Sequence, residues 1–297
     1  MRRAVFLDRD DTLIQNAGDL GDPDGVRLAG GAPAAIARLR ENGFAVVVVT
    51  NQAGVARGAF SLSSVALVHE RITQQLAVAL DLPLPQQPPT IGPADALPAP
   101  APDAPLIEAF FHCPFHPEAT VAEFRRSHPW RKPAPGMLLA AAQSLNLDLT
   151  RSWMVGDAER DVEAGAAAGC RTVRLGSDID RARSLADFVE RDLPRAVERI
   201  VAALLADDRP RSSIVLRALT GGPLAHQETR NTVASAARAI AERNGVTLES
   251  LTVLDDRVRA TLVGEEIVAV GFAAELRRST EGWYRAHHGS SLWGAAP

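Results

Sequence analysis

The chain has 297 residues, of which 46% are hydrophobic and 23% charged, and its formal net charge is −4. These values are typical of a globular protein with one large domain or two ordinary ones, and they give no reason to expect nucleic acid or an anionic membrane as a partner. No apolar run approaches the roughly 20 residues of a membrane span, and the N-terminus, MRRAVFLDRD, becomes acidic too early for a secretory signal. Two cysteines make no disulfide framework, so we expect a cytoplasmic protein.

The first predicted element is a short buried strand at residues 4–7, AVFL, which runs directly into acidic residues. Asp8 and Asp10 are two positions apart, so at the end of a strand both side chains project to the same side of the backbone. Carboxylates this close repel one another. They therefore indicate a bound cation, or a chemistry that uses the two carboxylates separately.

A helix, a strand and a second helix come next. Residues 31–43 have apolar side chains at helical spacing. Residues 44–50, FAVVVVT, are an apolar β-branched run of the kind that is covered on both faces in a parallel sheet. A longer helix is predicted over residues 61–80, with Ser61 or Ser63 as its N-cap.

The composition then changes. Residues 83–105 contain nine of the twenty prolines, and proline is excluded from the interior of helices and of central strands. We predict an extended, mobile insertion there, followed by a strand at residues 106–113.

Helices and strands alternate in the next part of the chain, with helices at 135–147 and 159–170 and strands at 152–157 and 171–175. This alternation predicts an α/β domain with a doubly wound parallel sheet. Right-handed crossovers bring the carboxyl ends of such strands to one edge of the sheet. We therefore expect Asp8, Thr50 and Asp157 to meet there.

The rest of the chain predicts a second, smaller domain. A helix is expected over about residues 182–206 and a linker over 207–213. A strand, a helix at 232–245, two strands (LTVLDD and RATLVG/EEIVAVGF) and a final helix then predict a small α+β domain. The expected division is a first domain of residues 1–206 and a second of residues 212–297, whose function no motif indicates.

The acidic groups at the strand ends suit phosphate chemistry. One carboxylate of the Asp8 and Asp10 pair could attack phosphorus and form an aspartyl-phosphate, while the other protonates the leaving oxygen and then deprotonates water. Mg²⁺ is expected to relieve the repulsion between carboxylate and phosphate, with Asp157 and Asp161 supplying further oxygens.

The phosphate needs partners of its own. Thr50 and the backbone N–H of Asn51 could hold phosphate oxygens, and Lys132 could neutralise charge in the transition state. Arg57, in GVARG, would either reach a second phosphate or hold its own loop, and the sequence favours neither.

The segments DRDDT, VVVTN, RKPAPGM and GDAERD resemble the four motifs of the haloacid dehalogenase (HAD) superfamily of phosphohydrolases. They occur in that superfamily's order between residue 4 and about residue 176, each at a predicted strand end or in the following loop. FLDRDDTLI, VTNQAGVARG, CPFHP, EFRR and RKPAPGM are most similar to the D-glycero-D-manno-heptose-1,7-bisphosphate 7-phosphatase and histidinol-phosphatase family. The resemblance implies an HAD-like Rossmannoid fold.

The resemblance also implies roles for single residues. Asp8 would be the nucleophile and Asp10 the general acid and base. Mg²⁺ would be held by Asp8, by the backbone carbonyl of Asp10 and by Asp157. Arg131, next to Lys132, would contact the substrate.

The sequence departs from the family at Asp11, which stands where the family usually has glycine. Asp tolerates a positive φ better than most residues, so we expect the turn to survive. The Asp11 side chain is expected to point to solvent, although its charge could alter metal affinity.

A second departure concerns a structural zinc that the family commonly holds with Cys-x-His and a later Cys-x-Cys. Here Cys113 remains, but Phe115 replaces the histidine, and His128 and Trp130 replace the two later cysteines. The ligand types left for a rescued site are His112, Cys113, His116 and His128. Their spacing is irregular, so we expect no structural zinc and predict that Phe115 and Trp130 fill the space by apolar packing.

The predicted function is a Mg²⁺-dependent phosphomonoesterase acting on a small phosphorylated metabolite, with a sugar bisphosphate such as D-glycero-D-manno-heptose 1,7-bisphosphate as first choice. Asp10 favours phosphate ester cleavage over dehalogenation, because a carbon–halogen bond needs no protonated leaving group. Histidinol phosphate is the second choice. A polynucleotide 3′-phosphatase would need a basic surface that binds the nucleic-acid strand, and the net charge of −4 gives little support for one. The rival from another class is a non-catalytic binding or scaffold protein built on a phosphatase fold, and the oligomeric state is not indicated.

Overall fold

The computed structural model describes residues 1–16, 18–84, 87–97, 106–177, 183–206, 210–219 and 222–294. The chain divides into two compact units, Met1–Asp208 and Arg209–Pro297. Each unit has hydrophobic core residues of its own. Among the helices of the described ranges, none combines the length and the apolar character that crossing a bilayer requires.

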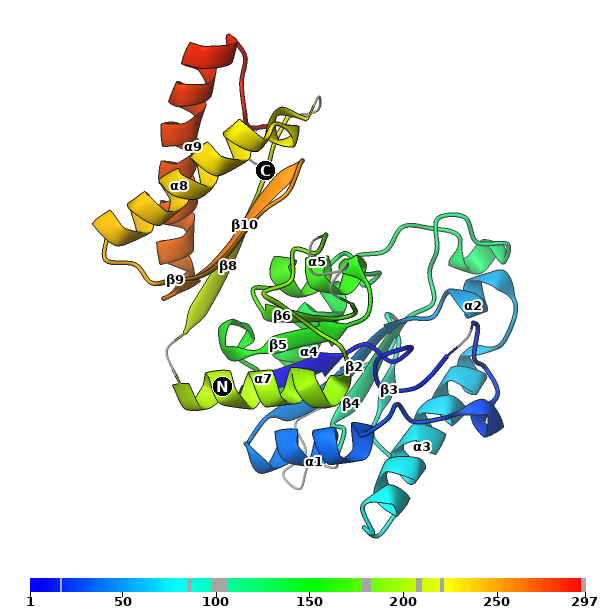
Figure 1. The fold of residues 1–297 in the computed structure, drawn as a ribbon. Coiled ribbons are helices and arrows are strands. Elements are labelled where there is room, and N and C mark those ends of the chain that lie inside the picture. The colour runs from blue at the N-terminus through cyan, green and yellow to red at the C-terminus, as the bar shows by residue number, and fades with distance from the viewer. Residues whose placement is uncertain are drawn as a thin grey trace. The chain divides into compact units, whose positions relative to one another are not determined.

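The first unit is built on a seven-stranded sheet (Figure 1). From one edge to the other its strands are β3 (Thr90–Ile91), β4 (Ala109–Cys113), β2 (Ala45–Asn51), β1 (Ala4–Leu7), β5 (Trp153–Gly156), β6 (Arg171–Leu175) and β7 (Phe188–Glu190). Every neighbouring pair is parallel. The chain starts in the middle of the sheet and extends it in both directions, which confirms the predicted doubly wound parallel sheet.

Helices cover both faces of this sheet (Figure 1). They are α1 (Ala32–Glu41), α2 (Ala53–Arg57), α3 (Leu62–Ala79), α4 (Gly136–Leu145), α5 (Glu159–Ala167) and α7 (Leu193–Ala206), with short 3₁₀ helices at Pro23–Gly25, Ala122–Phe124 and Leu149–Arg151. The predicted N-cap of α3 is confirmed for Ser61, whose side chain accepts a hydrogen bond from the backbone N–H of Ser64.

The alternation of side chains along each strand divides the core of this unit into two layers. Leu7 of β1 lies in a buried cluster with Ile36 of α1 and Ile200 of α7. Its neighbour Phe6 points to the opposite face and lies in a second cluster with Met137 of α4. Because both faces are covered, the central strands are apolar until their carboxyl ends, where β2 finishes with Thr50 and Asn51.

Part of the proline-rich insertion belongs to the sheet. Thr90–Ile91 form β3, a short extended segment that pairs with β4 at the edge of the sheet and was not predicted as a strand. An edge strand tolerates nearby prolines, because its outer side needs no hydrogen-bond partner. Residues 85–86 and 98–105 of the predicted insertion lie outside the described residues.

The helix predicted over 182–206 is wrong in its first part. Phe188–Glu190 form β7, and α7 begins only at Leu193. Pro194 explains the late start, because proline is well tolerated in the first turn of a helix and breaks its interior. The sheet consequently gains a seventh strand that the sequence did not predict.

The second unit contains a three-stranded antiparallel sheet in the order β8, β10, β9. Its elements in chain order are β8 (Arg211–Arg217), a 3₁₀ helix (Pro223–Ala225), α8 (Gln227–Arg243), β9 (Leu248–Val253), β10 (Arg257–Val263) and α9 (Glu266–His288). The predicted small α+β architecture is confirmed. Its core includes Val233 and Ile240 of α8, Ala260 of β10 and Leu276 of α9.

One element of the second unit differs from the prediction. EEIVAVGF, predicted to extend a strand, lies at the start of α9 apart from its first residue, the N-cap Glu265. Its β-branched residues suggested a strand. The buried side chains Ala269, Phe272 and Leu276 instead recur at helical spacing, so burial of one helix face outweighs local propensity.

Candidate active site

The carboxyl ends of three adjacent strands carry the candidate catalytic groups. Asp8 follows β1, Thr50 and Asn51 end β2, and Asp157 follows β5, while β1 lies between β2 and β5 in the sheet. Asp8, Asp157 and Asp161 offer carboxylate oxygens that all lie within 4.8 Å of one another. The parallel topology thus places groups from distant parts of the sequence at one edge of the sheet.

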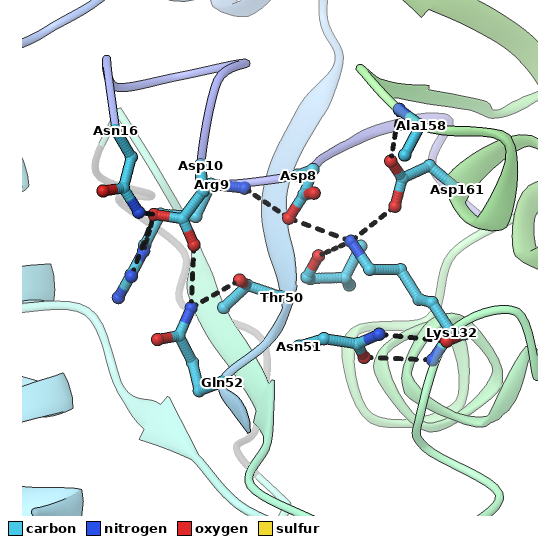
Figure 2. A network of polar contacts seen from close by, with 11 residues as sticks. Asp8, Arg9, Asp10, Asn16, Thr50, Asn51, Gln52, Lys132, Ala158 and Asp161 are labelled. Carbon is cyan, nitrogen blue, oxygen red and sulfur yellow. Dashed lines mark hydrogen bonds and ion pairs between the residues drawn. The ribbon is translucent and has the colours of Figure 1, made fainter. Parts of the chain in front are cut away.

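The side chain of Lys132 is fully buried and lies between the carboxylates of Asp8 and Asp161 (Figure 2). Its Nζ is 2.9 Å from Asp8 Oδ1 and 2.7 Å from Asp161 Oδ1, and it donates to the carbonyl oxygen of Val49 at 2.8 Å. Burial alone would lower the pKa of Lys132, but the charges of Asp161 and Asp8 outweigh it and raise that pKa. The group is therefore a charged ammonium that compensates the buried acids.

Asn51 joins the loop of Lys132 to the end of β2. The Asn51 side chain donates to the Lys132 carbonyl oxygen at 2.9 Å and accepts from the Lys132 backbone N–H at 3.0 Å (Figure 2). This closed pair of hydrogen bonds holds the two segments at a fixed spacing. The sequence suggested only a phosphate contact for the Asn51 backbone and did not reveal this task of its side chain.

The carboxylate of Asp10 is held by donors from both sides (Figure 2). Arg9, which is only 1% exposed, donates through Nε and Nη2 to Asp10 Oδ1 at 3.1 and 2.9 Å, and Asn16 donates to the same oxygen at 2.7 Å. Gln52 Nε2 donates to Asp10 Oδ2 at 3.0 Å and to the hydroxyl oxygen of Thr50 at 2.8 Å. These contacts fix the orientation of the carboxylate. The sequence analysis missed Asn16 and Gln52, although Gln52 directly follows the VVVTN motif.

Asp11 adopts the left-handed conformation that was expected of it, with φ of 52°. Its Oδ1 accepts a hydrogen bond from the backbone N–H of Asn16 at 3.0 Å, which compensates part of the cost of a positive φ. Because the Asn16 side chain bonds to Asp10, this turn helps to place Asp10. The residue is exposed, but its carboxylate has a structural partner that was not predicted.

Asp157 has the features of a cation ligand. Its Oδ1 is buried and has no hydrogen-bond partner within the described part of the chain. Burial, followed by the charges of Asp8 and Asp161, raises the pKa of Asp157 to about 6. An unpartnered oxygen among negative neighbours favours a divalent ion with oxygen ligands. The acidic group therefore fits Mg²⁺ by its donor chemistry.

Protons and Mg²⁺ should compete for Asp157, so we expect the affinity for Mg²⁺ to fall as the pH drops below about 6. A raised pKa means that the folded chain holds this proton more tightly than the unfolded chain, so the metal-free protein should lose stability as the pH rises from about 4 to about 6. Titration calorimetry with Mg²⁺ and thermal unfolding over this range test both trends. Asp157→Asn should weaken both trends, leaving the part of the stability trend that the raised pKa of Asp161 contributes. An affinity of the natural chain that is constant with pH would contradict the assignment.

Arg160 acts on the acidic group, since its positive charge opposes the rise in the pKa of Asp157 and of Asp161. Burial lowers the pKa of Arg131, Cys113 opposes this, and the positive charges of Arg160 and Arg57 lower the pKa further, so both arginines are within electrostatic range of Arg131. Arg57 forms an ion pair with Asp19. Arg160, in the first turn of α5, is exposed and forms no ion pair or hydrogen bond with any residue that the structure describes. The sequence did not reveal Arg160, since nothing in GDAERD distinguishes it from an ordinary surface arginine.

The candidate zinc ligands lie in and after β4 and do not gather into a site. Within the described ranges, the acidic group at the sheet edge is the only set of at least three His, Cys, Asp or Glu residues with ligand atoms close enough for one ion. The ring of Phe115 stacks on that of His128 with a centroid distance of 4.7 Å, and Trp130 packs on Phe111 at 5.7 Å. Aromatic contacts therefore occupy this part of the chain.

A family model described as HAD-hydrolase-like matches residues 129–204. Two curated relatives are D-glycero-beta-D-manno-heptose-1,7-bisphosphate 7-phosphatases. The one from Escherichia coli (strain K12) is 36% identical over 66% of this chain and 94% of its own length, and the one from Yersinia pestis is 35% identical over 66% and 95%.

Two solved structures are also similar to this chain. A putative HAD-like phosphatase from Mesorhizobium loti aligns with a TM-score of 0.54 and 29% identity over 69% of this chain and 87% of its own. The D,D-heptose 1,7-bisphosphate phosphatase from B. bronchiseptica, complexed with magnesium and phosphate, aligns with a TM-score of 0.52 and 27% identity over 68% and 99%.

Proposed function

Because this chain belongs to the HAD-like family of heptose-bisphosphate phosphatases, and is itself a phosphatase, we propose that it hydrolyses one phosphate ester of a sugar bisphosphate through an aspartyl-phosphate. One observation carries the proposal. The buried ammonium of Lys132 contacts both Asp8 and Asp161 beside the unpartnered oxygen of Asp157. Burying charges is costly, and this combination is the one that phosphoryl transfer uses.

In the proposed first step, a carboxylate oxygen of Asp8 attacks phosphorus, the P–O bond to the sugar breaks, and the sugar oxygen takes a proton from Asp10. Asp8 Oδ1 accepts from the backbone N–H of Arg9 at 2.7 Å and contacts Lys132. None of the described residues donates to Asp8 Oδ2. We therefore assign Oδ2 as the attacking oxygen.

In the second step, water attacks the phosphorus of the aspartyl-phosphate and gives its proton to Asp10, which releases inorganic phosphate and restores the Asp8 carboxylate. Thr50 and the backbone N–H of Asn51 are the proposed phosphate-binding groups. Since Gln52 donates to the Thr50 oxygen, the hydroxyl proton of Thr50 is left to donate to a phosphate oxygen.

The proposed Mg²⁺ ligands are Asp8, Asp157 and the backbone carbonyl of Asp10. Asp161 is a further oxygen donor with a second task, because its Oδ1 holds Lys132 and its Oδ2 accepts from the backbone N–H of Ala158 at 3.1 Å. When bound, the ion would neutralise negative charge on the phosphate and on the nucleophile. The related structure that holds magnesium and phosphate supports this assignment.

The proposed substrate is D-glycero-D-manno-heptose 1,7-bisphosphate, for which the relatives are named. Arg131 is the proposed contact to the substrate, and the positive charges of Arg57 and Arg160 act on it. The guanidinium groups of these arginines could bind a second phosphate group of the substrate. Arg160 is the best placed of the three for a new contact, because Arg57 is bonded to Asp19 and Arg131 to the carbonyl oxygen of Phe115.

We expect Arg160→Ala to raise KM for the bisphosphate roughly tenfold, about the loss of one charge-assisted contact, and to leave p-nitrophenyl phosphate hydrolysis unchanged. Steady-state kinetics with both substrates measure the difference. Arg38→Ala is the matched control, since Arg38 is an exposed arginine in the last turn of α1. Equal effects of Arg160→Ala on both substrates would contradict a contact to the second phosphate.

The substrate assignment is tested by comparing kcat/KM for the heptose bisphosphate, for histidinol phosphate and for p-nitrophenyl phosphate, with the full chain and added Mg²⁺. The bisphosphate should exceed the others by a factor of about 100 or more, because only it engages both phosphate sites. A higher value for histidinol phosphate would overturn the proposal in favour of the second choice.

A further inference from the structure

We propose that stacked aromatic rings take the place of a metal in holding the loop between β4 and α4, and that this aromatic clasp positions Arg131. The clasp consists of Phe115, Phe124, Arg126, His128 and Trp130. The effect of the aromatic clasp on substrate binding rests on the proposed contact of Arg131 with the substrate. Its effect on the order of the loop is independent of that contact.

Phe115 is the centre of the aromatic clasp. Its ring stacks on His128 at 4.7 Å with an interplanar angle of 21°, and the guanidinium of Arg126 lies 3.9 Å from the same ring centroid. Phe124 packs on it at 5.9 Å. The ring is only 7% exposed. Stacking and cation–π contacts of this kind stabilise beyond apolar burial, so together they can order a short loop.

The carbonyl groups of the two stacked residues hold Arg131. The backbone N–H of Arg131 donates to the carbonyl oxygen of His128 at 2.9 Å. The guanidinium of Arg131 donates through Nη1 to the carbonyl oxygen of Phe115 at 3.1 Å. The two stacked residues therefore supply both backbone acceptors of Arg131, so a change in the course of the backbone around the rings would move both acceptors.

The direction of the Arg131 side chain depends on the same loop. The next residue is Lys132, whose Nζ is fixed by Asp8 and Asp161 at the other end of its side chain. The charged groups of these two neighbouring residues thus lie in different places. The Lys132 ammonium lies in the buried acidic group, and the Arg131 guanidinium lies at the loop. The aromatic clasp acts on the second cation, so Phe115 and His128 are positioning residues.

The residues of this loop do not fit a zinc ion. Burial raises the pKa of the Cys113 thiol, which opposes the thiolate form that zinc binds. His116 Nδ1 accepts from the backbone N–H of Glu118 at 3.0 Å, and His128 Nδ1 accepts from that of Trp130 at 3.1 Å. The ring of His128 thus stacks on Phe115 and accepts a hydrogen bond from Trp130, which leaves Nδ1 unavailable to a metal ion.

Two substitutions at one position separate the aromatic clasp from a metal site. His128→Phe keeps a ring on Phe115 and removes both ligand nitrogens, whereas His128→Ala removes the ring. Both variants lose the hydrogen bond from the Trp130 backbone N–H, so the difference between them reports on the ring. We expect His128→Phe to behave like the natural chain. His128→Ala should raise KM for the bisphosphate roughly tenfold with kcat nearly unchanged, because a misplaced binding group costs affinity on this order. Phe188→Leu, which removes a ring beside the guanidinium of Arg199, is the control for a lost aromatic side chain elsewhere.

A double-mutant cycle shows whether the effect passes through Arg131. Arg131→Ala should raise KM at least as much as His128→Ala, and the double variant should be no worse than Arg131→Ala alone. Additive losses would contradict the positioning role.

Two readouts do not depend on turnover. The zinc content of the purified chain should be far below one atom per chain, and amide hydrogen exchange over residues 113–136 should rise in His128→Ala but not in His128→Phe. Stoichiometric zinc, or equal exchange in the two variants, would overturn the aromatic clasp. If exchange changes as expected while no bisphosphate is hydrolysed, the clasp stands and the proposed substrate is wrong.

Discussion

Asp8→Asn is expected to lower kcat for p-nitrophenyl phosphate by at least about 10⁴-fold, the scale seen when a covalent nucleophile is removed. The amide keeps the shape of the side chain and can still accept from the backbone N–H of Arg9, but it is not a nucleophile for phosphorus. Initial rates with and without Mg²⁺ measure the loss. Circular dichroism establishes that the variant is folded.

The matched control for this variant is Asp11→Asn, which removes the same charge three residues away. Asp11 is exposed, and asparagine can keep both the positive φ and the hydrogen bond from the Asn16 backbone. Its activity should stay within a factor of about three of the natural chain. Substantial Mg²⁺-dependent turnover by Asp8→Asn, in a preparation free of contaminating phosphatase, would disprove the aspartyl-phosphate mechanism.

Lys132→Met is expected to abolish turnover and to destabilise the fold by about 3–5 kcal/mol, since removing one partner of a buried ion pair leaves the other charge uncompensated. Methionine has a similar length and no charge. The variant leaves Asp8, Asp157 and Asp161 without their ammonium. Urea unfolding at pH 7.5, followed by fluorescence, measures the stability, and phosphate release measures the activity.

The lost stability should partly return on acidification. The pKa values of Asp157 and Asp161 are raised, so their protonation at about pH 5 removes repulsion in the folded chain. Arg40→Met is the control, because Arg40 is a half-buried cation paired with Glu108, which also has Arg2 as a partner. It should cost about 1 kcal/mol or less. Unfolding of Lys132→Met at the same urea concentration as the natural chain would refute the compensating role of the ammonium.

The sequence predicted the sheet and the convergence of Asp8, Thr50 and Asp157 because both follow from one rule. Parallel strands with helical crossovers have their carboxyl ends at one edge, so residues that end strands meet there whatever their separation. The position of Lys132 is different, since it lies in a loop and does not end a strand. Strand topology therefore does not place it with the acids; its assignment came from the charge that phosphoryl transfer must neutralise and from its resemblance to a known motif.

The features that the sequence did not reveal are hydrogen bonds that depend on the backbone conformation of turns, and a strand that is too short to show a pattern. Asn16 reaches Asp10 because Asp11 adopts a positive φ, and Gln52 reaches both Asp10 and Thr50 at the turn from β2 into α2. The missed strand β7 is three residues long, too short for a clear period. The hydrogen bonds of Asn16 and Gln52 can be assigned only once the backbone conformation of the turns is known.

The order of strands in the parallel sheet also has a consequence for how the protein acquires activity. The site needs residues from the ends of β1, β2 and β5, and β1 is paired on either side by strands that follow it at very different distances along the chain. Such nonlocal pairing is slow and is completed late in refolding. Recovery of phosphatase activity after dilution from denaturant should therefore lag behind the return of helical signal. A nascent chain still lacking β5 should be inert even where its first helices have formed.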